Sequence, residues 1–511
     1  LAGDWWLGAL AGKTVIASYA VLTALGLLAA GKRLQSETAG GVAALVYVST
    51  AWVIQVSTLG LVDAALGCYL SLAFYAVCLA FGPLSLWERV RVRADDRGST
   101  RSTERLAGQA TTPLARRQRS KPAAEQEGGI ARRPHPRPLS QTERGDLSGR
   151  VLLLAGYLAG GAASCKYPGL LFVVVPLTVW VFFTRGPCAD RWRPSWKPAG
   201  AFLLAAAAGC GLWFAKNWAL TGNPTYPLLY SVFGGETWTP EKDRQWNAVH
   251  RPHDFSLRTL GWDAARVALT SPWLSPLVMP LAALGFAGRR RRGTALLAAC
   301  FALVIAAWWL LTHRIDRFWI PVLPLAAMAA GLGATWSRDR VWRYAMIVFL
   351  VAGTAANFVA CTAATFLADS AVWYQENAYF APLDQLRKTP RRVGEWHAYL
   401  NREARHGRVL LVGDAQPFDL EMPVLYNTCF DDSILEPLVK GRSPQQVRAA
   451  LAERGITHVY VDWDEIARYR RTYGYPEFVQ PDVFDQLVAD GILIPLLVTP
   501  EHGGVYCVRV P

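Results

Sequence analysis

Charged residues are scarce in this chain of 511 residues. Lys, Arg, Asp and Glu make up 18% of it, whereas they make up about a quarter of an average soluble protein. With 52% hydrophobic residues, the composition excludes a chain that is disordered throughout, which has few hydrophobic residues and many charges. The apolar residues also gather in runs of roughly 17–25, the length that crosses a bilayer. The sequence therefore predicts a multi-pass membrane protein rather than one soluble domain.

Several motifs that mark common kinds of site are also absent. The nine cysteines include no Cys-x-x-Cys pair and no Cys/His cluster, which argues against a zinc site and against a dense disulfide framework. No Gly-x-Gly-x-x-Gly follows a predicted strand, which argues against a dinucleotide site. Neither a secretory signal peptide nor an internal repeat is visible. The formal charge of +14 must be interpreted by location before it suggests nucleic acid.

Ten apolar segments meet the criterion of about 20 residues for a membrane span. Their approximate ranges are 9–30, 41–57, 61–87, 150–165, 167–184, 199–218, 271–288, 294–312, 318–336 and 343–366. The fourth and fifth are short and meet at Lys166 and Pro168. These two segments therefore form either two spans or one broken unit, because backbone breaks at membrane depth need protein or water to satisfy them.

Basic residues follow every second apolar segment. They include Lys32, Arg33, Arg89, Arg91, Arg185, Arg191, Arg289, Arg290, Arg338, Arg340 and Arg343. Cytoplasmic loops carry an excess of Lys and Arg, so these connections are predicted to face the cytoplasm. Leu1, the loop at 219–270 and the region 367–511 then lie on the other side. Because such proteins normally begin in the cytoplasm, we expect at least one helix before Leu1.

Two ranges lack the pattern of membrane spans. Residues 88–149 are rich in Arg, Pro, Ser, Thr and Gln, which predicts a disordered, basic cytoplasmic insertion. An inert insertion is favoured over an arm that binds nucleic acid or lipid. Residues 367–511 are predicted to hold an extra-cytoplasmic α/β domain with a small Rossmann-like sheet. Cys429 and Cys507, its cysteines, can pair outside the cytoplasm, although free thiols are the favoured alternative.

The α/β prediction rests on apolar strands that alternate with helical patterns. The predicted strands are 408–414, 458–462, 492–498 and 505–510, and the predicted helices are 443–454 and 483–489. Ser443 is expected to cap the first of these helices and Gly455 to end it.

Polar residues that lipid disfavours gather at span ends on the predicted outer side. They are Asp63, Lys166, Lys216, Asn217, Asn223, Tyr226, Arg314, Asp316 and Arg317. A set in which cations outnumber carboxylates suits a phosphate-bearing substrate, because Lys and Arg neutralise phosphate oxygens. A carboxylate can also take the proton of an attacking hydroxyl.

Each of these residues also has a structural explanation. Asp63 can serve as a helix cap, and Lys166 and Lys216 can anchor their helices at the membrane interface. Arg314 and Arg317 can pair with Asp316 between them. His250 and His253 in the outer loop can bind a metal ion, but lone loop histidines usually do not.

The pattern resembles the GT-C superfamily of integral-membrane glycosyltransferases, which includes protein O-mannosyltransferases and aminoarabinose transferases that use polyprenyl-phosphate sugars. The matching segments are Thr58–Leu66, Leu158–Gly169, Lys216–Pro227 and Arg314–Pro324. Their order, spacing and side of the membrane agree with that family. The resemblance covers roughly 1–366 without the insertion, and the region after it resembles the extra-cytoplasmic domains of some bacterial members.

The resemblance implies a transferase that moves a sugar from a polyprenyl-phosphate carrier to an acceptor on the extra-cytoplasmic side. Asp63 would act in catalysis or help hold a divalent cation, whose participation stays open. The substrate and its phosphate would be bound by Lys166, Lys216, Asn217, Asn223, Tyr226, Arg314 and Arg317. The expected location is the inner membrane of a bacterium, with the bilayer as partner and no nucleic acid.

One departure from the family concerns its principal acid, which lies in the first outer loop. Here only Asp4 precedes the first apolar segment, so we expect either that this acid was lost with a truncated N-terminus or that the chain is inactive. The alternatives to an enzyme are a transporter or flippase for a lipid-linked anion and an inactive copy that acts as a membrane assembly protein.

Overall fold

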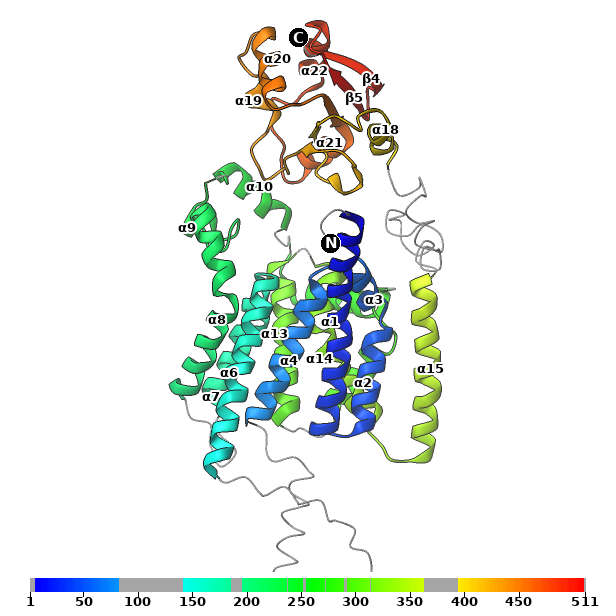
Figure 1. Ribbon diagram of the computed structural model, residues 1–511. Coiled ribbons are helices and arrows are strands. Elements are labelled where there is room, and N and C mark those ends of the chain that lie inside the picture. The colour runs from blue at the N-terminus through cyan, green and yellow to red at the C-terminus, as the bar shows by residue number, and fades with distance from the viewer. Residues whose placement is uncertain are drawn as a thin grey trace, which may run out of the picture. The chain divides into compact units, whose positions relative to one another are not determined.

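The computed structural model describes residues 5–81, 141–184, 195–236, 238–250, 254–271, 273–288, 292–312, 314–362 and 394–509 (Figure 1). These ranges belong to two compact units. The first unit comprises residues 1–210, 273–305 and 319–357, and the second comprises 211–272, 306–318 and 358–511. Residues 82–140, which hold most of the predicted insertion, lie outside the described residues.

Helices build the first unit. They are α1 (Trp5–Leu34), α2 (Glu37–Ser49), α3 (Ala51–Thr58), α4 (Asp63–Phe81), α6 (Gln141–Cys165), the π-helix η1 (Leu170–Val174), α7 (Val175–Phe183), α12 (Val278–Ala287), α14 (Leu323–Ala334), and the parts of α8 (Trp196–Thr221), α13 (Arg292–Leu311), the 3-10 helix η2 (Asp316–Val322) and α15 (Arg340–Thr362) that fall in its ranges.

Each of the ten predicted apolar segments holds a helix. Among the described residues, six helices are long and apolar enough to cross a membrane, and α2 and α3 together make a seventh if they are counted as one span. Shorter apolar helices occupy Leu170–Phe183 and Val278–Ala287. The count of ten spans therefore stays a prediction.

The second predicted span is broken rather than straight. α2 and α3 meet at an angle of 59°, and Thr50 between them has an extended backbone (φ −65°, ψ 126°). The break frees the backbone N–H of Trp52, which donates to the carbonyl of Trp273 at 3.0 Å. The hydroxyl of Thr50 donates to the carbonyl of Val46 at 2.7 Å. Polar backbone groups in lipid must be satisfied internally, and these two bonds do so here.

Residues 141–149, which the sequence assigned to the disordered insertion, are helical instead. They form the first turns of α6. The last proline of the insertion is Pro138, and the Gln, Glu and Arg residues that follow it are good helix formers. The apolar half of α6 therefore continues without a break into polar turns.

Small residues let α6 and α8 approach each other closely. A Cβ added to Gly160 would lie 2.1 Å from the carbonyl oxygen of Ala206, and one added to Gly209 would lie 2.5 Å from that of Tyr157. The hydroxyl of Ser164 donates to the carbonyl of Gly209 at 3.1 Å. Contacts of this kind drive helix association in lipid, where apolar burial alone gives little.

The second unit joins the predicted outer loop to the C-terminal region. The loop holds α9 (Tyr230–Phe233), α10 (Pro240–His250) and α11 (Leu257–Thr270). The ammonium of Lys242 on α10 donates to the carbonyl of Phe430 at 3.1 Å and lies 3.5 Å from the carboxylate of Asp432. Trp238 packs against Phe430 with ring centroids 5.3 Å apart.

An α/β domain forms the C-terminal part of this unit. Its elements are α18 (Glu395–Glu403), β1 (Val409–Val412), η5 (Pro417–Asp419), β2 (Val424–Leu425), α19 (Leu435–Val439), α20 (Pro444–Glu453), β3 (His458–Asp462), α21 (Trp463–Arg471), α22 (Pro481–Ala489), β4 (Leu493–Thr499) and β5 (Gly503–Val508). The sheet has the order β2-β1-β3-β5-β4. β1 pairs in parallel with β2 and β3, whereas β5 pairs antiparallel with β3 and β4.

Side chains of the central strands alternate between two buried clusters. Leu410 and Val412 point into the larger cluster with α19, α20 and α22, while Val409 and Leu411 point into the smaller one with α18. Successive residues of a strand face opposite sides of a sheet, and a strand covered on both sides is apolar throughout. The predicted strands and helices are confirmed, whereas the Rossmann-like character of this mixed sheet stays a prediction.

The sequence missed five elements of the domain, which are α18, η5, β2, α19 and α21, and the structure leaves the two cysteines of the domain unpaired. β2 has only two residues, and α21 buries only Ile466, so neither gives a clear apolar pattern. Cys429 and Cys507 are both free thiols, which makes the disulfide considered for them wrong. Cys429 belongs to the larger cluster, where burial raises the pKa of its thiol to about 11.

Candidate functional site

Asp63 is the first residue of α4, and its side chain is only 1% exposed. Gly60 before it has a positive φ of 73°, a conformation that glycine adopts without steric cost. This turn ends α3, with Leu61 donating its N–H to the carbonyl of Val56 at 2.9 Å, and it starts α4 two residues later. The carboxylate therefore lies at the N-terminal end of a helix, where the helix dipole favours negative charge.

Lys166 follows directly after α6, and its ammonium lies 2.6 Å from Oδ1 of Asp63. Gly169 donates its N–H to the carbonyl of Lys166 at 2.8 Å. A Cβ at Gly169 would lie 2.3 Å from the carbonyl oxygen of Ala162, so this turn requires glycine. The expectation that Asp63 and Lys166 lie at the same end of the helices is confirmed by their contact.

The two partners differ in their access to solvent. The Lys166 side chain is 29% exposed, against 1% for Asp63. Lys166 is therefore a partly exposed lysine whose ammonium is bonded to a buried carboxylate, so it does more than reach toward the membrane surface. Removing one partner of a buried ion pair commonly costs about 3–5 kcal/mol, because the other charge is left uncompensated.

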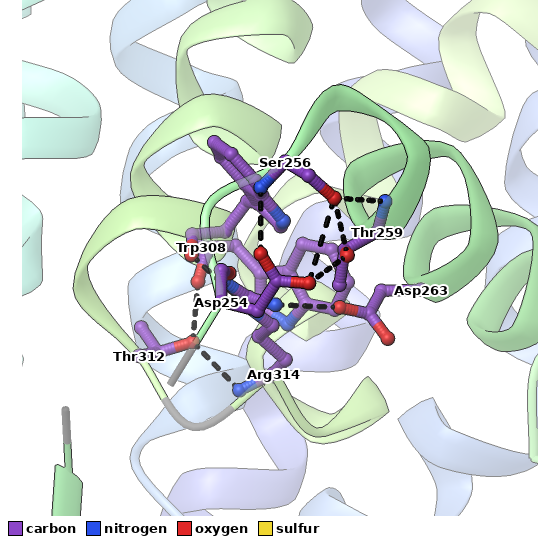
Figure 2. A network of polar contacts seen from close by, with 8 residues as sticks. Asp254, Ser256, Thr259, Asp263, Trp308, Thr312 and Arg314 are labelled. Atoms are coloured by element: carbon purple, nitrogen blue, oxygen red, sulfur yellow. Dashed lines mark hydrogen bonds and ion pairs between the residues drawn. The ribbon is translucent and has the colours of Figure 1, made fainter. Parts of the chain in front are cut away.

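Arg314, in the second unit, is held by a polar network (Figure 2). Its side chain donates to Asp263 Oδ2 at 2.8 Å, to the carbonyl of Trp309 at 3.1 Å, and to the carbonyl of Asp254. Arg314 is 9% exposed and has a positive φ of 59°. This guanidinium links α11, the end of α13 and residue 254, so it has a structural role that the sequence did not reveal.

Asp254 and Asp263 are the partners that sequence reasoning missed. Asp254 accepts hydrogen bonds from the hydroxyl of Thr259 and from the N–H of Ser256, which hold the pKa of its carboxyl below its usual value. Ser256 in turn caps α11 by accepting from the N–H of Thr259 at 3.1 Å. The Asp-x-Ser-x-x-Thr spacing gives a capping signal, but nothing in it indicates an arginine about 50 residues away.

Asp316 and Arg317 lie in η2, and both are half-buried. Asp316 accepts a hydrogen bond from the hydroxyl of Ser271, and Arg314 pairs with Asp263 instead of Asp316. The assignment of Arg314 and Arg317 to phosphate binding stays a prediction.

Asn217, Asn223 and Tyr226 organise the turn after α8. The amide of Asn223, which is fully buried, donates to the carbonyls of Leu228 and Gly234 at 2.9 Å each, and its oxygen accepts from the N–H of Thr225 at 2.8 Å. Asn217 donates to the carbonyl of Pro224 at 3.4 Å. The Asn223 side chain therefore stabilises the loop through these bonds. They explain why an asparagine lies at this position without any contact to a substrate.

Lys216 and Tyr226 each contact a tryptophan. The ammonium of Lys216 lies 3.9 Å from the ring centroid of Trp213, and Lys216 is exposed, as expected of an interfacial anchor. The ring of Tyr226 meets that of Trp238 edge to face, with centroids 6.0 Å apart.

No group of three or more His, Cys, Asp or Glu side chains with a metal-binding arrangement occurs in the part of the chain that the structure describes. His250 stacks on Trp246 at 4.1 Å and its Nδ1 lies 2.8 Å from the carbonyl of that residue. His253 lies outside the described residues.

The predicted site residues thus fall into two groups, each described within its own unit. Asp63 and Lys166 belong to the first unit, and Lys216, Asn217, Asn223, Tyr226, Arg314 and Arg317 belong to the second.

Comparisons of the sequence find no matching family model and no matching curated protein. Solved structures do match. ArnT from Cupriavidus metallidurans in the apo state is 12% identical, with a TM-score of 0.53 over 97% of this chain and 83% of that one. The same ArnT bound to undecaprenyl phosphate is 12% identical over the same shares, with a TM-score of 0.48. Mycobacterial arabinofuranosyltransferase AftD is 14% identical, with a TM-score of 0.41 over 97% of this chain and 35% of that one.

The likeness to apo ArnT extends over nearly the whole of this chain, helices and C-terminal region included. Together with the apolar helices, it shows that the chain is a multi-pass membrane protein that shares the fold of ArnT.

Proposed function

We propose that this chain is a membrane glycosyltransferase that moves a sugar from a polyprenyl-phosphate carrier to an acceptor hydroxyl on the extra-cytoplasmic side. The observation that carries the proposal is the ion pair of Asp63 and Lys166 at the start of α4. Within a fold shared with ArnT, this pair presents one cation at the end of a membrane helix, where a lipid phosphate would reach it.

Lys166 is the residue we assign to the phosphate of the carrier. Its side chain is partly exposed, and an ammonium is a point charge that neutralises a phosphate oxygen. Asp63 holds the ammonium in place, since its Oδ1 accepts from Nζ at 2.6 Å. Because Asp63 is 1% exposed, we assign it the positioning of Lys166 instead of the deprotonation of the acceptor that the sequence first suggested.

The proposed step is a single displacement at the anomeric carbon. The oxygen of the acceptor hydroxyl forms a bond to that carbon and loses its proton to an outer-loop carboxylate, which acts as the base. The bond from the anomeric carbon to the phosphate oxygen breaks, and its electron pair leaves with the phosphate. Lys166 stabilises the negative charge that develops on this oxygen, the kind of interaction that often contributes most to catalysis.

Variants of the ion pair test the proposal. We expect Lys166→Ala to lower kcat/KM for sugar transfer roughly 10²- to 10³-fold, the effect of losing one group that stabilises developing charge. Lys166→Arg keeps the positive charge and should retain more activity. Asp63→Asn should raise KM for the carrier and lower kcat less than Lys166→Ala does, because the ammonium remains but is less well placed.

The measurement is the release of undecaprenyl phosphate from undecaprenyl-phosphate sugars, with the full chain reconstituted in vesicles. Lys197→Ala is the matched control, because Lys197 is an exposed lysine of the same unit. Unchanged rates in both Lys166→Ala and Asp63→Asn would overturn the assignment. Movement of the carrier lipid between leaflets without any sugar transfer would favour the flippase instead.

A further inference from the structure

A cavity of about 1900 Å³ lies within the first unit, lined by residues of α1, α2, α4, α13, α14 and α15. Much of its wall is apolar, with Leu27, Val77, Leu296, Met328 and Leu350 among the lining residues. Sites for small molecules usually enclose about 300–1,000 Å³. The volume therefore exceeds what a small metabolite needs and suits a ligand with long apolar chains.

Four cations stand at one end of this cavity. Lys32 and Arg33 come from the end of α1, and Arg338 and Arg343 come from the start of α15 and the residues before it. Glu37 is the one acidic residue in the lining, so four positive charges and one negative charge leave +3. The ion pair between Lys32 and Glu37 is exposed, and an exposed pair contributes only about 0–1 kcal/mol.

These cations are about 300 residues apart in the sequence, yet both groups were predicted to face the cytoplasm. Their presence around one cavity agrees with that prediction, because it places the ends of α1 and α14 at the same end of the helices. The ligand that they suit is an anion, and arginine in particular binds phosphate through a planar fork of donors.

α15 forms one wall of the cavity. Near its C-terminal end, Asn357 donates to the hydroxyls of Ser275 at 2.8 Å and Ser49 at 3.2 Å, and Gly353 approaches Leu277 closely. Toward its N-terminal end, Arg343 and Leu350 line the cavity. Only 17% of the α15 span is buried, so the helix is fastened at one end and forms an outer wall at the other.

The cavity is separate from the pair of Asp63 and Lys166. Asp63 begins α4, whereas Phe81, the last residue of that helix, lines the cavity. Nineteen helical residues span roughly 28 Å at 1.5 Å each. A ligand here would contact the membrane leaflet opposite to the proposed transfer site.

We propose that this cavity binds an anionic phospholipid of the adjacent leaflet. The headgroup phosphate lies among Lys32, Arg338 and Arg343, and the acyl chains lie along the apolar wall. Juxtamembrane Lys and Arg attract anionic lipids, and here the cations adjoin an apolar space in which the chains of such a lipid fit. The lipid fills the gap beneath α15 and holds that helix against α2 and α14.

The test measures lipid binding by the full chain in two ways. One uses the protein in nanodiscs, and the other uses native mass spectrometry after extraction in detergent. The probe is phosphatidylglycerol, with phosphatidylcholine as the neutral lipid. We expect selective retention of phosphatidylglycerol, and a loss of roughly 10- to 30-fold in its affinity when Arg338 and Arg343 are both changed to Gln, since each cation contributes modestly. Changing both to Lys keeps the charge and should keep most of the binding.

Arg340→Gln is the matched control, because Arg340 begins the same helix and is exposed but does not line the cavity. Equal binding of the two lipids, or equal losses in Arg340→Gln and in the double variant, would overturn the proposal. Displacement of phosphatidylglycerol by undecaprenyl phosphate at equal concentration would overturn it in favour of a carrier site. Asp63→Asn should leave phosphatidylglycerol binding unchanged, which separates this proposal from that of sugar transfer.

Discussion

The membrane helices and the C-terminal sheet are held together by different contacts. In the sheet, large aliphatic side chains such as Leu410 and Val412 fill a cluster between strands and helices, and burial of apolar area stabilises it by roughly 25 cal/mol per Å². In the helices, backbones meet at small residues such as Gly160 and Ala206. Lipid is as apolar as leucine, so close packing replaces apolar burial as the source of association.

The contrast extends to neighbouring helices of the first unit. In the apolar span formed by η2 and α14, 78% of the residues are buried inside the protein. In the apolar span of α15, only 17% are buried. Both helices are apolar all round, so hydropathy does not distinguish the one that is packed by protein from the one that faces lipid.

The largest loss of stability should come from a substitution in the core of the sheet. Leu410→Ala removes a fully buried side chain and should lower the free energy of unfolding of the C-terminal domain by about 2–5 kcal/mol. The measurement is the urea midpoint for proteolysis of that domain in the full chain. Leu496→Ala on β4 is the control, because Leu496 is 40% exposed. Similar shifts for both would contradict the assignment of Leu410 to the core.

A smaller effect is expected where α6 meets α8. Gly160→Ala places a Cβ 2.1 Å from the carbonyl oxygen of Ala206, and forcing such a group into a packed contact costs about 1–3 kcal/mol. We expect a lower midpoint of thermal unfolding in detergent. The midpoint is measured by fluorescence-detected size-exclusion chromatography after heating. Gly200→Ala in α8 has open space around its Cβ and should not lower the midpoint. If Gly160→Ala is as stable as Gly200→Ala, the close approach of these helices is not required.

The smallest effect should come from the cap of α20. Ser443 accepts from the N–H of Gln446, whose side chain accepts in return from the N–H of Ser443. Ser443→Ala should cost about 1 kcal/mol, while Ser443→Asp keeps an acceptor and should cost less. The same urea proteolysis measures both variants. Equal stability of Ala and Asp at this position would indicate that the cap contributes nothing.

The sequence predicted much of the fold, for reasons that differ between the two regions. Apolar length located a helix in each of the ten segments, and short apolar runs located β1, β3, β4 and β5. The break at Thr50 escaped prediction because the bond from Trp52 to Trp273 that satisfies it depends on a distant residue. Residues 141–149 were misassigned because polar residues extend a helix whose apolar half alone was recognised.

The candidate site was predicted only in part. Asp63 and Lys166 were predicted because they are charged residues at the ends of apolar spans, and in the structure they form an ion pair. The same criterion selected Arg314, but its partners Asp254 and Asp263 lie in the outer loop, and single residues in a polar loop carry no signal of such a contact. Asn223 was selected for its turn, and its hydrogen bonds explain the turn itself.

Exchanging the charges of Asp63 and Lys166 tests the account most directly, because it separates the stability of the pair from the position of its cation. The double variant Asp63→Lys with Lys166→Asp keeps an ion pair but moves the ammonium to the buried partner's position. We predict that it is more stable than either single variant, yet neither binds undecaprenyl phosphate nor transfers sugar in reconstituted vesicles. Transfer by the exchanged protein at the rate of the unmodified chain would contradict the account, since the pair would then serve only to hold α4 and α6 together.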